Sequence, residues 1–184
     1  LDLRKAFDLV DHEILLHKLK LYHFTEMSMK LFRSYLCNRA QLIKGKNIKS
    51  KKMTIVSGVH QGSILGPLLF LFYFNDMPLH ASDSSIDLYA DDSTLYKIGP
   101  KILKIESTLQ KSLNSVNCWC KTNNMSLHPS KTKCMVLSNN FKVKKAKQLE
   151  LTIDGLSVEN VKYQKVLGVH VDQTLSWHTH VNTV

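Results

Sequence analysis

The sequence lacks a long apolar segment. Its longest apolar run, Ile64 to Phe74, is broken by Gly66 and Pro67 and is far shorter than the roughly 20 residues that a membrane-spanning helix needs. This excludes a transmembrane helix and predicts no membrane partner. Cysteine is also scarce: the four cysteines form no Cys-X-X-Cys pair, so we expect free thiols rather than a disulfide framework. No initiator Met or targeting segment is visible, so we expect the chain to be a piece of a longer protein.

Arginine is rare as well, although the protein is strongly basic. The 184 residues contain 25 Lys and Arg against 15 Asp and Glu, a net charge of +10, yet only Arg4, Arg33 and Arg39 are arginines. Lysine suits phosphate groups but not the bidentate reading of base edges, so the charge predicts sequence-independent binding to nucleic acid. Two clusters stand out: Lys44, Lys46, Lys49, Lys51 and Lys52, and then Lys142, Lys144, Lys145 and Lys147. The alternative is that these lysines only keep loops soluble and blunt strand edges.

Apolar spacing predicts the helices. Hydrophobic residues make up 43% of the chain, which leaves room for a core and excludes a wholly disordered polymer. Apolar positions three and four residues apart predict four helices: one capped by Asp11 and running to about Tyr22, then 25–37, 67–75 and 102–120. The third is apolar nearly all round and should be buried. The fourth has one apolar stripe, so its polar face should meet solvent.

Short β-compatible runs predict the strands. Three pairs should form hairpins: 41–46 with 53–57, 86–90 with 93–98, and 150–153 with 156–158. The last two should turn at Asp91-Asp92 and, with a primed turn, at Asp154-Gly155, while 134–138 and 166–171 should be single strands. This order is typical of an α+β fold, an antiparallel sheet with helices packed on one face. We expect one domain over 1–184, with a candidate hinge near 139–147 before a C-terminal hairpin region.

Acidic residues suggest a metal site. Asp91 and Asp92 are adjacent in an otherwise apolar hairpin, where two like charges repel unless a cation or solvent screens them. Asp2 lies in a second short apolar context. If the two strands are neighbours, three carboxylates converge, and such an oxygen-only cluster suits Mg²⁺ rather than zinc. Two ions roughly 3.5–4 Å apart can stabilise both the attacking and the leaving oxygens of a phosphoryl transfer. The alternative is that the Asp-Asp pair is only turn chemistry.

Five segments follow one another along the chain: LDLRKAFDLVDH at 1–12, GVHQGSILGPLLF at 58–70, YADD at 89–92, SKT at 130–132 and LGV at 167–169. In this order they resemble the palm motifs of reverse transcriptases, above all those of non-LTR (LINE-type) retrotransposons. The resemblance implies a right-hand polymerase palm with incomplete fingers and thumb. It also implies DNA synthesis from deoxynucleoside triphosphates on an RNA template and a DNA primer, with two Mg²⁺ (or Mn²⁺) ions held by Asp2, Asp91 and Asp92.

The resemblance assigns further residues to the substrates. Phe7 stands where the family places an aromatic ring under the sugar, which leaves no room for a 2′-hydroxyl; the alternative is a core aromatic beside Ala6. Gln61 and Gly62 match a loop that approaches the nascent base pair and the template, and the alternative is an ordinary turn. The family usually has proline before Gln-Gly, whereas this chain has His60, so that source of loop rigidity is lost.

Lys131 matches a family lysine proposed to protonate or stabilise the departing pyrophosphate. Lys133 is a rival for this role, and an ordinary solvated lysine is the alternative. Because the resemblance leaves fingers and thumb incomplete, we expect weak or absent polymerase activity from the isolated chain. Two other functions stay open: a catalytically inactive, basic nucleic-acid-binding remnant, and another palm-type phosphotransferase such as a nucleotide cyclase.

Overall fold

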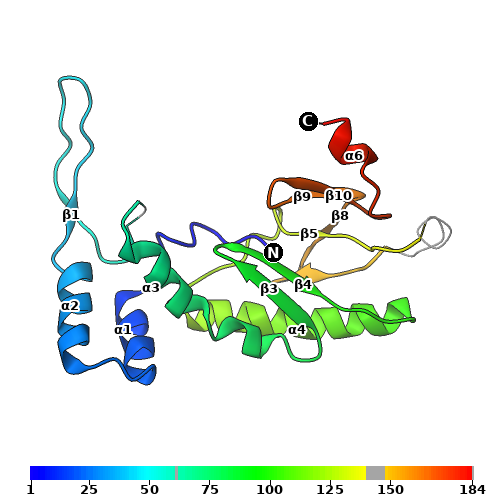
Figure 1. Cartoon of the computed structure of the whole chain (residues 1–184), viewed down its shortest axis with the longest axis horizontal. Coiled ribbons are helices and arrows are strands. Elements are labelled where there is room, and N and C mark those ends of the chain that lie inside the picture. The colour runs from blue at the N-terminus through cyan, green and yellow to red at the C-terminus, as the bar shows by residue number, and fades with distance from the viewer. Residues whose placement is uncertain (61, 140–147, 184) are drawn as a thin grey trace. The chain divides into compact units, whose positions relative to one another are not determined.

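The computed structural model describes residues 1–60, 62–139 and 148–183. The chain divides into two compact units, each built from separate stretches. The first comprises Leu1–Arg4, Met77–Cys120 and the described residues from Ser126 onward, and the second comprises Lys5–Asp76 and Lys121–Met125. Both helices and short strands are present (Figure 1), so the predicted mixture of α and β structure is confirmed. None of the described helices combines the length and apolar character that crossing a membrane requires.

The strands of the described residues pair two by two instead of forming one continuous sheet. Four of these pairs are antiparallel, as predicted. The fifth joins β5 (Lys133–Cys134) to β8 (Glu159–Asn160) in parallel. A parallel pair needs a long connection, and here residues 135–158 provide it. The predicted antiparallel pairing is therefore present in the described residues as small two-stranded sheets, and many of their strands are only two residues long.

Three helices build the second unit: α1 (His12–Leu21), α2 (Glu26–Leu36) and α3 (Leu65–Phe74). Asp11 caps α1 by accepting hydrogen bonds from the backbone N–H groups of Glu13 and Ile14 at 2.9 and 3.0 Å. Thr25 caps α2 through the N–H of Ser28. α1 packs against both other helices. The predicted starts of the first two helices are thus confirmed.

Helix α3 begins two residues before the predicted start at Pro67. Pro67 still lies in the first turn, where its missing N–H costs no hydrogen bond. One side of the helix is buried, but Leu68 and Leu71 on the other side are 44% and 54% exposed. The prediction that α3 is buried all round is therefore wrong, because its neighbours cover one side only.

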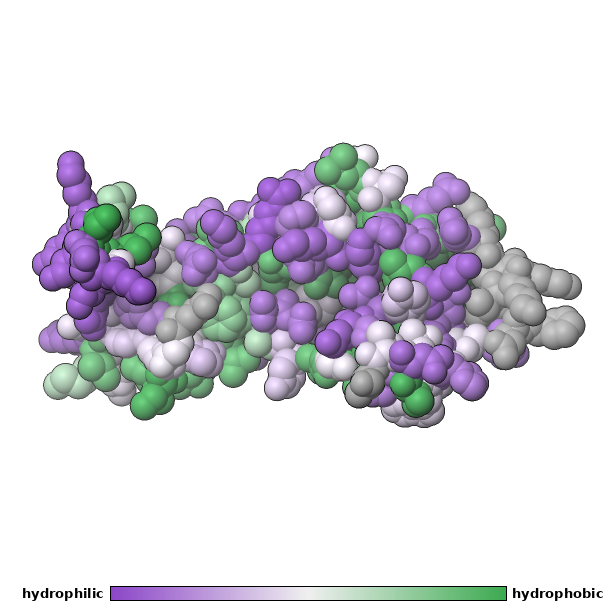
Figure 2. Space-filling model, turned by 90° about the horizontal axis from the view of Figure 1, so that it is seen from above, coloured by the Kyte–Doolittle hydropathy of each residue, from purple (hydrophilic) through white to green (hydrophobic). Residues whose placement is uncertain are grey.

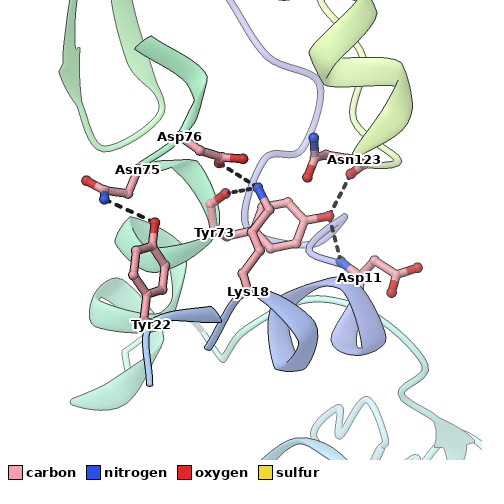
Figure 3. Close-up of polar contacts among 7 residues, drawn as sticks. All are labelled: Asp11, Lys18, Tyr22, Tyr73, Asn75, Asp76 and Asn123. Atoms are coloured by element: carbon pink, nitrogen blue, oxygen red, sulfur yellow. Dashed lines mark hydrogen bonds and ion pairs between the residues drawn. The ribbon is translucent and has the colours of Figure 1, made fainter. Parts of the chain in front are cut away.

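A buried lysine links α1 to the end of α3 (Figure 3). Lys18 Nζ donates to the backbone oxygen of Tyr73 at 2.7 Å and to Asp76 Oδ1 at 2.6 Å, and lies 4.9 Å from the centre of the Tyr73 ring. The Tyr73 hydroxyl donates to the backbone oxygen of Asn123 at 2.6 Å and accepts from the N–H of Asp11 at 3.4 Å. Burial lowers the pKa of Lys18, and the contact with Asp76 opposes this shift. The network ties three segments of the second unit to one aromatic side chain.

A hairpin with many lysines follows α2 (Figure 1). Its strands are β1 (Ala40–Gln41) and β2 (Met53–Thr54), and Lys44 bridges Lys49 further out. The predicted hairpin is confirmed, although its strands are shorter than predicted. All five lysines of the first cluster are exposed, and so are the apolar side chains of Ile43 and Ile48 in the same hairpin. Figure 2 shows hydrophilic side chains (purple) beside hydrophobic ones (green) at this end of the molecule. The second lysine cluster lies outside the described residues, as does the candidate hinge except for Asn139.

The long helix α4 (Ile102–Thr122) carries the core of the first unit. Its predicted apolar stripe is confirmed at four buried residues: Leu109, Leu113, Val116 and Cys120. Its polar side meets solvent, as predicted, at Lys104, Ser107, Lys111 and Asn114. Gln110 donates to the backbone oxygen of Thr152 and accepts from its N–H, at 2.9 and 2.8 Å. Asn117 Nδ2 likewise donates to Asp154 Oδ1 at 2.9 Å.

Two hairpins follow near the C-terminus. The first is β6 (Thr152–Ile153) with β7 (Leu156–Ser157), and its turn residues Asp154 and Gly155 have φ of 51° and 79°, as the predicted primed turn requires. The second is β9 (Tyr163–Val166) with β10 (Val169–Asp172). It replaces the single strand predicted over 166–171, because Leu167 and Gly168 turn with φ of 47° and 88°. The strand predicted over 134–138 is likewise wrong beyond Cys134. Among the described residues, the remaining short helices are η1 (Met77–His80) and α6 (His178–Val181).

Candidate active site

The N-terminal segment lies next to the YADD hairpin within the first unit. The hairpin consists of β3 (Ser85–Tyr89) and β4 (Asp92–Tyr96). The Leu1 ammonium donates to the backbone oxygen of Ser93 at 2.6 Å. Further along the segment, Leu3 forms a β-bridge with Leu127, and the N–H of His128 donates to the backbone oxygen of Asp2 at 2.8 Å. The first and third motifs of the sequence are therefore neighbours in space.

Asp2 and Asp92 line one groove of about 590 Å³, which also runs along β4 and α4. Asp2 is half-buried and Asp92 is exposed. Burial lowers the pKa of the Leu1 ammonium, and the negative charges of Asp2 and Asp92 act against this shift. Two carboxylates from distant parts of the sequence therefore act on the same positive charge.

Asp91 occupies the turn of the hairpin. Tyr89 pairs with Asp92, so the two loop residues are Ala90 and Asp91, one position earlier than predicted. Ala90 has a φ of 54°, in the left-handed region that glycine usually fills at this position of a two-residue turn. Asp91 is exposed and does not line the groove. Asp92 is thus the member of the Asp-Asp pair that shares the groove with Asp2.

The two candidate lysines differ in their partners. Both Lys131 and Lys133 line the groove. Lys133 Nζ lies 2.5 Å from Glu159 Oε2 and donates to the backbone oxygen of Ser130 at 3.0 Å. Lys131 is exposed, and its backbone N–H is bonded to the oxygen of His128. The ammonium of Lys133 is therefore committed to a structural ion pair, which favours Lys131 for a role toward a ligand.

The donor chemistry of Asp2 and Asp92 fits a hard divalent cation, which prefers carboxylate oxygens. Both carboxylates act to raise the pKa of the nearby Leu1 ammonium, although burial lowers it overall. Within 1–60, 62–139 and 148–183, however, no three His, Cys, Asp or Glu side chains gather closely enough to hold a metal ion. Two of the three predicted metal ligands, Asp2 and Asp92, therefore line the groove. The third, Asp91, precedes Asp92 in the sequence and does not line it.

The candidate substrate residues belong to the second unit. The Phe7 ring is half-buried and stacks on Phe70, with ring centroids 4.1 Å apart and an angle of 12° between the planes. Gly62 is exposed with a φ of 83°, and nothing lies within 4 Å of a Cβ placed there. A loop at Gly62 is thus open to close approach by another molecule. Gln61 lies outside the described residues.

Sequence reasoning gave no role to two residues that shape these sites. Thr132 is buried, and its hydroxyl accepts a hydrogen bond from the N–H of Asp2 at 3.1 Å, which holds the segment that carries this carboxylate. It lies inside the SKT motif, which could have drawn attention to it. Tyr35 donates to the Ser63 hydroxyl at 2.6 Å, beside the loop that contains Gly62. No motif or spacing marks Tyr35, because its partner lies 28 residues away.

Acidic motifs on neighbouring segments, beside a groove lined by lysines, are typical of enzymes that handle phosphate groups. The family described as "Reverse transcriptase (RNA-dependent DNA polymerase)" matches residues 1–171. The chain belongs to this reverse transcriptase family.

Similar proteins come from mobile elements of Drosophila melanogaster. The chain is 28% identical to the RNA-directed DNA polymerase from mobile element jockey over 191 aligned positions, which cover 100% of the chain. It is 30% identical to the probable RNA-directed DNA polymerase from transposon BS over 98% of the chain, and 29% identical to that from transposon X-element over 100%. The chain spans 20% of the length of each of these relatives. These similarities support a reverse transcriptase of the LINE type.

Proposed function

We propose that this chain is a palm fragment of a retrotransposon reverse transcriptase and takes part in RNA-templated DNA synthesis by two-metal nucleotidyl transfer. The observation that carries the proposal is the pairing of Leu1 with Ser93, which brings Asp2 and Asp92 to one groove. Membership of the reverse transcriptase family supports the same reaction. The substrates would be an RNA template, a DNA primer and deoxynucleoside triphosphates.

In this proposal Asp2, Asp92 and the adjoining Asp91 would hold the two Mg²⁺ ions. When bound, such ions stabilise the attacking 3′-oxygen of the primer and the leaving oxygen of pyrophosphate. Lys131 would keep its proton until the pyrophosphate leaves and then donate it or balance its charge. Thr132 would keep the Asp2 backbone in place through the 3.1 Å hydrogen bond to its N–H.

The proposal also keeps Phe7 as the residue that excludes the 2′-hydroxyl, and Gln61 and Gly62 as contacts to the nascent base pair. The stack of Phe7 on Phe70 supports a rigid ring, which a steric gate needs. The open space around Gly62 supports close approach of a base pair to the backbone. The half-burial of Phe7 is equally compatible with a packing role, so the two roles need separate tests.

Primer extension on an RNA template tests the catalytic proposal, with the chain alone and joined to its flanking coding sequence. Asp92→Asn should reduce Mg²⁺-dependent incorporation by about 100-fold or more, because a carboxylate that binds the ions is lost. Asp87→Asn is the matched control, since Asp87 is an exposed carboxylate on the paired strand of the same hairpin. Equal activity of the two variants would refute the assignment of Asp92.

The β1–β2 hairpin favours a second candidate function, binding to nucleic acid without catalysis. Its five exposed lysines are accompanied by no Asp or Glu anywhere in residues 38–57. Each lysine that contacts a phosphate contributes about 0.9 to the slope of log K against log salt for duplex DNA. The double variant Lys44→Gln/Lys49→Gln should therefore lower this slope by about 2. Salt-dependent binding without any incorporation by the unaltered protein would favour this second function over the first.

A further inference from the structure

A single hydroxyl group, that of Ser63, links His60 to the start of α3. Ser63 Oγ donates to the backbone oxygen of His60 at 2.7 Å and accepts from the N–H of Gly66 at 3.0 Å. Tyr35 Oη lies 2.6 Å from the same oxygen. Because the proton of Ser63 goes to a carbonyl, which can only accept, Tyr35 must be the donor of the third bond. The hydroxyl of Ser63 therefore has both its donor and its acceptor positions filled.

The loop packs closely onto the first turn of α3. A Cβ at Gly66 would lie 2.4 Å from the oxygen of His60, so only glycine allows this approach. Ile64, the residue at the N-cap position, provides no side-chain cap. Ser63 instead bonds the Gly66 N–H, one of the helix-start N–H groups that lack a partner within the helix. The position of the His60 carbonyl is thus coupled to the start of the helix.

Tyr35 is itself held in place on α2. Its ring meets the His60 ring edge-on at 5.9 Å, and the guanidinium of Arg39 lies 5.8 Å from the ring centre. Arg39 Nε also donates to the backbone oxygen of Tyr35 at 3.0 Å. Two neighbours therefore restrict the rotation of the side chain whose hydroxyl reaches Ser63.

We propose that Tyr35 is a positioning residue: through Ser63 it fixes the His60 carbonyl at the entry to the loop that carries Gly62. It would supply the rigidity that proline at position 60 would otherwise give. The role rests on the proposed function, in which this loop contacts the nascent base pair. Tyr35 does not touch the substrate, and it acts only through the loop.

Tyr35→Phe is the test variant because it keeps the ring and deletes only the hydroxyl. Hydrogen exchange at the Gly66 amide should become about five- to tenfold faster, while the urea midpoint changes little, because one half-buried hydrogen bond is lost locally. Tyr22→Phe is the matched control, since its hydroxyl bonds Asn75 on another side of the unit. In primer extension the KM for deoxynucleoside triphosphate should rise about fivefold with little change in kcat, since the chemistry of the groove is untouched.

Adding His60→Pro to Tyr35→Phe should restore both slow exchange and the low KM. Unchanged exchange at Gly66 in Tyr35→Phe would overturn the clamp itself. Faster exchange with an unchanged KM would overturn its role in positioning. If the unaltered full-length protein gives no extension that depends on Asp92, the proposed function fails and the positioning role fails with it, whereas the exchange result still reports the hydrogen bond.

Discussion

The Tyr73 hydroxyl gives a prediction that can be worked out in numbers. Tyr73 is fully buried, and burial, its largest influence, raises its pKa from 10.0 to about 12; the hydrogen bond from Asp11 opposes the shift. Because the phenol of Tyr73 is harder to ionise in the folded than in the unfolded protein, its full contribution to stability is present below pH 10. That stabilisation is lost as the pH rises toward 12. A shift of about two pKa values corresponds to at most about 2.7 kcal/mol of unfolding free energy.

Tyr73→Phe removes the group that titrates, its 2.6 Å hydrogen bond to Asn123 and the longer, 3.4 Å bond from the Asp11 N–H. At pH 7 the variant should be less stable by about 1 kcal/mol, the net worth of one such bond. By pH 11 the wild-type protein should have lost about 1.4 kcal/mol relative to the variant, so the order of stability should reverse near that pH.

Urea unfolding at pH 7, 9, 10 and 11 measures the difference between the two proteins. The buried thiols of Cys120 and Cys134, whose pKa values burial raises to about 12 and about 11, titrate in both proteins and cancel in the difference. A difference that stays constant between pH 7 and pH 11 would refute the reasoning from burial.

Three further outcomes are expected. Asp11→Ala should lower the unfolding free energy by about 1 kcal/mol at pH 7, because α1 loses its cap. Hydrogen bonding from Ile14 lowers the pKa of Asp11, so the stability advantage of the wild-type protein should shrink as the pH falls below 3.8. A stability difference that does not change with pH would contradict this. Leu167→Asn should raise the thermal midpoint by roughly 2–4 °C, because asparagine tolerates the φ of 47° that strains leucine, and a lower midpoint would count against that strain. Phe7→Ala should both destabilise the protein, by about 2 kcal/mol, and admit ribonucleotides in primer extension; destabilisation alone would leave only the packing role.

The sequence predicted best those features that depend on a few adjacent residues. Asp11 and Thr25 cap helices because their side-chain oxygens reach N–H groups two or three residues ahead. Asp154-Gly155 turns as predicted because both residues tolerate positive φ. Leu167 carries no such local signal, so the residue pattern predicted a single strand over 166–171 where β9 and β10 form a hairpin.

Features that depend on distant partners could not be derived from local pattern. Neighbouring segments determine the parallel pairing of β5 with β8 and the burial of only one side of α3. The spacing of apolar residues along the sequence does not identify these neighbours. In the site, motif order pointed to Asp2, Asp91 and Asp92; the segments that carry Asp2 and Asp92 are adjacent, whereas Asp91 does not line the groove. The contact of Lys133 with Glu159, which separates it from Lys131, and the bond from Tyr35 to Ser63 became visible only in three dimensions.

The side chain of Gln110 makes the hydrogen bonds that a neighbouring strand would make. Its amide bonds both the N–H and the C=O of Thr152, so the edge of β6 has no free backbone groups at that residue. A strand edge with unpaired backbone groups can pair with strands of other molecules and so promotes fibril-like association. One glutamine on α4 therefore helps to keep this short hairpin from recruiting further copies of the chain.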